Sequence, residues 1–106
     1  MTSTPLHALG AAELGARYRS GELSPVAVVR ACLERVAAWE PRLCALYALD
    51  ADAALAQARA SEARWLRGAP LSALDGVPCT IKENIATRGG PVPLGTAATG
   101  LAPASA

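Results

Sequence analysis

The chain changes character at Ala69-Pro70, and this break limits what it can fold into. Before the break, apolar residues recur at intervals of three and four, which is typical of amphipathic helices. After it come most of the prolines and glycines, and the helical spacing is lost. We therefore expect residues 1–70 to form a helical layer and residues 71–106 to begin a different kind of structure.

Two helices are predicted in the first part of the helical layer. The first covers about Ala11–Ser20 and is followed by Gly21, a residue that suits a helix end. The second begins at Pro25 behind Ser24, because serine is a good N-cap and proline suits the first helical position. It should end one or two residues before Pro41, because the residue that precedes a proline disfavours the helical conformation.

A third helix is predicted from an N-cap at Asp50 to about Arg67, with Gly68 after it. Its inward face is marked by Leu55, Ala58 and Trp65. The preceding stretch, from Leu43 to Leu49, is short and apolar, so we expect either a brief strand or a buried turn there. No helix carries a cluster of titratable residues on one face, which favours a packing role for all three.

A short β-strand is predicted over Val77–Lys82, where alternate residues are apolar. It follows a turn at Leu74–Gly76, and Pro78 is acceptable because it lies near the start of the strand. Residues 88–106 are rich in glycine, proline, alanine and threonine and predict no regular element.

The apolar residues of this chain can form only a thin core. They make up 52% of the sequence, but 25 of them are alanine and phenylalanine is absent. Alanine buries little area, and a chain of 106 residues supports one modest core at most. The length fits one small domain or part of a larger one.

Charge and hydropathy exclude several classes of function. The net charge is +1 with no block of like charge, which argues against nucleic-acid binding through phosphate neutralisation. No apolar run approaches the roughly 20 residues of a membrane span, and no secretory leader is visible. Neither a membrane partner nor a nucleic-acid partner is therefore expected.

The cysteines predict reduced thiols in a cytoplasmic protein. There are three of them, well separated and outside any CxxC pattern. With His7 as the one histidine, a zinc site is not expected. The phosphate- and dinucleotide-binding glycine motifs are absent, so we predict no cofactor and no metal.

Lys82 is the one lysine among ten basic residues. Arginine stays protonated in proteins, whereas a buried lysine can lose its proton and act as a base. Two interpretations of Lys82 follow from composition and spacing. It is either a solvated side chain paired with Glu83, or a residue with a catalytic or ligand-binding role.

The segment around Lys82, GVPCTIKENI (residues 76–85), resembles the GVPxxIK[DE]NI segment of the amidase signature family. The helical region upstream and the run LGTAATGLAPASA downstream are similar to that family as well. The resemblance implies an α/β fold. This chain would supply the N-terminal portion of one incomplete amidase domain, mostly α, with three helices, a short strand and an irregular tail.

The resemblance also implies hydrolysis of a small-molecule amide. In that family a serine attacks the amide carbonyl, a second serine with a cis peptide bond relays its proton, and an unprotonated lysine is the base. Lys82 matches this catalytic lysine. The Gly/Ser-rich motif that carries both serines is missing here, since the six serines are scattered. We therefore expect the 106 residues to be an N-terminal piece that is inactive alone.

Two alternatives remain at this point. The parent protein could be the glutaminase subunit of a tRNA-dependent amidotransferase, which shares the lysine segment and works with partner subunits. The chain could instead be a small helical interaction module without catalysis. The reading frame after Ala106 distinguishes an enzyme from the interaction module, because continuation into a Gly/Ser-rich segment favours an enzyme and a stop codon favours the module.

Overall fold

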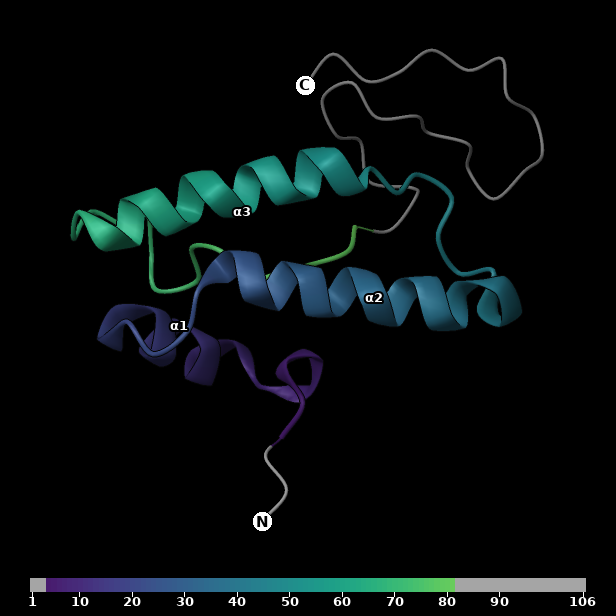
Figure 1. Ribbon diagram of the computed structural model, residues 1–106, viewed down its shortest axis with the longest axis horizontal. Coiled ribbons are helices and arrows are strands. Elements are labelled where there is room, and N and C mark those ends of the chain that lie inside the picture. The colour runs from purple at the N-terminus through teal and green to yellow at the C-terminus, as the bar shows by residue number, and fades with distance from the viewer. Residues whose placement is uncertain (1–3, 82–106) are drawn as a thin grey trace.

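The computed structural model of the protein describes residues 4–81. These residues form a short 3-10 helix, η1 (Leu6–Ala8), followed by three α-helices, α1 (Ala11–Ser20), α2 (Pro25–Leu43) and α3 (Ala51–Leu66). Helices α2 and α3 pack side by side and run in opposite directions, and α1 lies near the end of the pair where α2 begins and α3 ends (Figure 1). The chain then turns back beyond α3 towards Ile81 (Figure 1).

The helix starts predicted from the sequence are confirmed. The Ser24 side chain accepts a hydrogen bond from the Val26 N–H at 3.1 Å, so it caps α2 as expected. Asp50 caps α3 in the same way, with 2.9 Å between its carboxylate and the Ala53 nitrogen. Gly21 ends α1 in the left-handed conformation, with φ of 78°. Each cap satisfies backbone groups that a helix end leaves without partners.

The predicted end of the second helix is wrong, because α2 continues through Pro41 to Leu43. Pro41 lies in the last turn, where its missing N–H removes only one helical hydrogen bond. The carbonyl that loses this bond belongs to exposed Ala37, where water can replace it. The helix ends instead at Cys44, which is left-handed with φ of 48° and donates its N–H to the Glu40 carbonyl.

The predicted short β-strand is also wrong as far as the structure describes it. Residues 4–81 contain no strand, and Val77–Ile81 is irregular. A strand is completed by hydrogen bonds to a neighbouring extended segment, and residues 4–81 offer none. The alternation of apolar residues does not give one buried face either, since Val77 is half-buried whereas Ile81 is 53% exposed. Lys82, the last residue of that prediction, lies outside the described residues.

The apolar linker between α2 and α3 forms neither of the predicted structures. Among residues 44–49 there is no strand, and all but Leu46 are exposed. The expected tail over residues 88–106 lies outside the described residues. A further finding is that no described helix is long and apolar enough to cross a membrane.

The hydrophobic core is small, as the alanine-rich composition predicted. Its fully packed centre consists of Leu14, Tyr18 and Val28. Five partly buried side chains surround it: Leu9, Leu23, Cys32, Trp65 and Val77. This core joins α1, α2 and α3 to the chain that follows α3, so it helps to place the approach to Lys82.

Gly15 lets α1 approach the turn after α3 closely. A Cβ atom at this position would collide with the main-chain carbonyl oxygen of Ala73. The sequence suggests only that this glycine weakens the helix. The structure shows that it is buried and that the contact has no room for a methyl group.

We predict that Gly15→Ala lowers the free energy of unfolding by about 1–3 kcal/mol, because the added methyl group overpacks the contact. Helix propensity alone predicts the opposite, a gain of about 1 kcal/mol. Urea denaturation of the protein measures the difference. The matched control is Ala16→Gly at the exposed neighbouring position, which should lose about 1 kcal/mol through propensity. A gain in stability for Gly15→Ala would contradict the close contact.

Candidate functional site

Lys82, the predicted catalytic base, lies immediately beyond the last described residue. Its position and environment therefore remain predictions. The structure does describe the turn that leads to it, residues 71–76, and the start of the following segment, Val77–Ile81. The turn predicted at Leu74–Gly76 is confirmed.

A bidentate ion pair between Arg64 and Asp75 holds the turn against α3. The Nε and Nη2 atoms of Arg64 donate to the two carboxylate oxygens of Asp75, each at 2.7 Å. The main-chain N–H of Leu71 donates to the same carboxylate at 2.9 Å. Asp75 is only 8% exposed, so this carboxylate is shielded from water and held in one orientation.

These contacts keep the Asp75 carboxylate ionised. The hydrogen bond from Arg64 is the main cause that holds the pKa of Asp75 far below its usual value, against the opposing effect of burial. The Leu71 N–H adds to the lowering, as does the nearby Ser61 hydroxyl. The same hydrogen bond raises the pKa of Arg64. Both partners therefore carry full charge at neutral pH.

Two aromatic side chains donate hydrogen bonds to consecutive carbonyl groups of the turn. Trp65 Nε1 donates to the carbonyl oxygen of Asp75, and the Tyr18 hydroxyl donates to that of Gly76, both at 2.9 Å. The two rings are neighbours, with 6.0 Å between their centroids. Burial, with a smaller contribution from Cys32, raises the pKa of Tyr18 to about 12, so its hydroxyl keeps the proton that it donates.

Gly76 cannot be another residue without rearrangement of the turn. Its φ of 86° is in the region that side chains disfavour. A Cβ atom there would also meet the Ser61 hydroxyl and would come within 2.9 Å of Pro25. Ser61 is almost fully buried, and its oxygen makes no hydrogen bond of normal geometry with the described residues. The packing thus leaves no room for a side chain at position 76.

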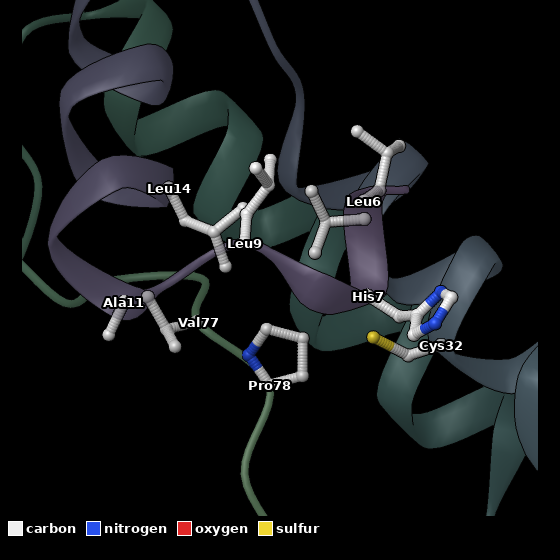
Figure 2. Close-up of a pocket in the computed structure, with 9 residues that line it drawn as sticks. Leu6, His7, Leu9, Ala11, Leu14, Cys32, Val77 and Pro78 are labelled. Carbon is white, nitrogen blue, oxygen red and sulfur yellow. The ribbon is translucent and has the colours of Figure 1, made fainter. Parts of the chain in front are cut away.

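Beyond the turn, the chain lines a pocket of about 220 Å³ between η1, α1 and α2 (Figure 2). Val77 and Pro78 form one wall, and the other lining residues are Leu6, His7, Leu9, Ala11, Leu14, Val28 and Cys32. Burial raises the pKa of the Cys32 thiol, which favours its neutral form. None of the three cysteines, all of which lie in the described part of the chain, is paired in a disulfide.

Within residues 4–81, no group of three or more histidine, cysteine or acidic side chains is arranged to hold a metal ion. His7 lines the pocket together with one thiol, and this pair by itself does not form a metal site. The described residues hold the turn, and they lead the chain towards Lys82.

The role of Asp75 was not predicted from the sequence. Local patterns place Asp75 in a turn and Arg64 in the last turn of a helix, which is correct for both but does not pair them. The two residues are eleven positions apart and lie in different elements, so no local spacing rule connects them. One usable signal was the presence of Tyr18 and Trp65 on alanine-rich helices, because buried rings of this kind usually find a hydrogen-bond partner.

Comparison with known proteins connects the chain to one family. The model of the family described as amidase matches residues 27–105. A glutamyl-tRNA(Gln) amidotransferase subunit of Chloroflexus aggregans is 43% identical over 93 residues, which cover 88% of this chain and 19% of that protein. The same-named protein of Myxococcus xanthus is 44% identical over 77 residues, covering 73% of this chain and 16% of its own length.

A third protein of that name, from Salinispora arenicola, is 40% identical over 93 residues, which cover 88% of this chain and 19% of that protein. The chain spans about a fifth of the length of these curated relatives. No solved structure matches the chain.

The ion pair predicts how stability depends on pH. Because the pKa of Asp75 is lowered in the folded state, its contribution is complete above the unfolded value of about 3.9 and is lost progressively as the pH falls below it. We predict that Asp75→Asn lowers the free energy of unfolding by about 2 kcal/mol at pH 7, and that this difference shrinks between about pH 4 and pH 2.

Urea denaturation at several pH values checks this prediction. The matched control is Asp52→Asn in the exposed first turn of α3, whose effect should stay below about 1 kcal/mol. An Asp75→Asn effect that is equal at pH 7 and pH 2 would show that the charge of Asp75 is not what stabilises the turn.

Proposed function

This chain belongs to the amidase family, and from that premise we propose that its parent protein hydrolyses the C–N bond of carboxamides. The observation that carries the proposal is the extent of the family match. It covers residues 27–105 and so includes the whole segment around Lys82. The substrate in this proposal is a small-molecule amide, and the reaction needs no cofactor.

In the proposed mechanism Lys82 is the general base. A serine attacks the amide carbonyl, and its proton passes through a second serine, with a cis peptide bond, to the unprotonated lysine. The proton then goes to the departing amine as the C–N bond breaks, and water hydrolyses the acyl-serine to release the acid. We do not assign the nucleophile to the described serines, since none of them lies in a Gly/Ser-rich motif. We place both catalytic serines outside these 106 residues.

A lysine can act as this base only if its environment keeps it neutral. Near its ordinary pKa of about 10.4, lysine is almost fully protonated at pH 7. Burial disfavours the ammonium form and lowers the pKa of a buried lysine by up to about 3–5 units. We propose that the complete domain buries Lys82 in this way.

The first test compares two substitutions of Lys82 in the complete protein. We predict that Lys82→Arg and Lys82→Ala both lower kcat/KM at least about 100-fold, because arginine keeps the charge but cannot accept the proton. Hydrolysis of p-nitroacetanilide measures the effect. Arg59→Lys, at an exposed position of α3, is the control and should retain full activity. If Lys82→Arg kept most of the activity, Lys82 would act as a cation and not as a base.

A second candidate function is supported by the names of the relatives. The three relatives described above are named as subunits of a glutamyl-tRNA(Gln) amidotransferase. The alternative is that the parent protein is the glutaminase subunit of such an assembly, in which partner subunits and tRNA take part. Its lysine chemistry would be the same, but its amide substrate would be glutamine.

Substrate choice distinguishes these candidates. For a general amidase, we predict that the purified complete protein hydrolyses p-nitroacetanilide without partner subunits and uses L-glutamine at least about tenfold less efficiently by kcat/KM. Ammonia release and p-nitroaniline release measure the two reactions. Glutamine hydrolysis that requires added partner subunits would favour the glutaminase subunit instead. Residues 1–106 alone are the negative control, since we expect them to lack the nucleophile.

A further inference from the structure

We propose that Asp75 is a positioning residue for Lys82, and that the ion pair with Arg64 fixes the direction in which the lysine segment leaves the helices. This inference rests on the proposed function, because it assigns a role in the same site. It concerns a residue that touches neither substrate nor reacting atoms. The role of Asp75 is to hold the chain from which Lys82 extends.

The first argument is the number and direction of the bonds that meet at the turn. The Asp75 carboxylate accepts two bonds from Arg64 and one from the Leu71 N–H. The carbonyl groups of Asp75 and Gly76 accept from Trp65 and Tyr18. These donors belong to α3, to α1 and to the turn itself, so they fix the orientation of the turn as well as its position.

The second argument is the type of interaction. The guanidinium group of Arg64 is planar and contacts both carboxylate oxygens, which specifies the angle between the partners. An apolar contact could bury a similar area without specifying that angle, since hydrophobic interactions have no direction. The turn itself is mostly exposed, with residues 71–74 all on the surface. Its conformation therefore depends on polar bonds more than on burial.

The third argument is the short path from this anchor to Lys82. Gly76 packs against Ser61 and Pro25 with no room for a side chain. Val77 packs on the core, and the ring of Pro78 restricts the backbone at the pocket wall (Figure 2). Only five residues separate Gly76 from Lys82 in the sequence, so little chain lies between the anchor and the lysine.

Catalysis is sensitive to such an anchor. A general base works only within hydrogen-bond distance of the group that gives up its proton. A displacement of about 1 Å at a reacting group costs on the order of 100-fold in rate. Rotation of the turn after loss of the ion pair would move the start of the lysine segment, and Lys82 with it.

The test uses Asp75→Asn in the complete enzyme, with p-nitroacetanilide in pre-steady-state rapid mixing. The amplitude of the first turnover reports the fraction of active enzyme, and its rate constant reports the chemistry at each active site. We expect the rate constant to fall about 10- to 100-fold, with a change in KM below about threefold. A merely structural role would lower the amplitude and leave the rate constant unchanged.

Two further variants complete the design. Asp50→Ala removes the N-cap of α3, at the end of this helix opposite Arg64, and should leave the rate constant unchanged. Tyr18→Phe removes only the hydroxyl that donates to Gly76, and we expect a rate constant reduced about 3- to 10-fold. If Asp75→Asn does not fold, Tyr18→Phe decides the question.

The outcomes separate this inference from the proposed function. If Lys82→Ala abolishes activity but Asp75→Asn keeps the wild-type rate constant, the positioning role is refuted and the amidase proposal stands. Where Asp75→Asn does not fold, Tyr18→Phe takes its place in this comparison. If Lys82→Ala is fully active, the proposed base is wrong, and the positioning role fails with it. A reduced rate constant at unchanged amplitude, together with an inactive Lys82→Ala, supports both.

Discussion

The bidentate ion pair between Arg64 and Asp75 is the interaction on which the end of the described structure depends. Residues 71–74 of the turn are exposed, so little burial of apolar surface holds them in place. Ion pairs on protein surfaces usually contribute little, because water competes for both charges. This one differs because Asp75 is nearly buried and also accepts the Leu71 N–H. Removing the carboxylate would leave three N–H donors, two of Arg64 and one of Leu71, without their partner, which costs more than the loss of an exposed pair.

A thin core explains why polar bonds have this importance. The helices are rich in alanine, and the packed centre contains few large side chains. Tyr18 and Trp65 compensate for the small core because each of them both packs and donates a hydrogen bond. Their rings fill the junction between α1 and α3, while their polar atoms donate to the carbonyl groups of Gly76 and Asp75. Core packing and turn geometry are therefore coupled, and substitution of either ring should affect both.

Most of the helical structure could be predicted because its signals are local. Ser24 and Asp50 each determine a helix start through bonds to residues two or three positions away. The strand prediction failed for the opposite reason, since a strand depends on a partner segment that no local pattern identifies. The site was only partly predictable. A resemblance in sequence singled out Lys82, but the Arg64–Asp75 pair joins residues whose proximity arises only when the turn folds back on α3.

Arg64 and Lys82 need different properties of a basic side chain. Arg64 has to remain charged and to contact two oxygens at once, and a guanidinium group does both. Lysine would provide one point charge and would lose the fixed angle. The proposed role of Lys82 makes the opposite demand, because a base must give up its proton, and arginine cannot do so. Arg64, a permanent cation, thus holds the turn, whereas the proposed function requires a cation that can become neutral, and Lys82 is the one lysine in the sequence.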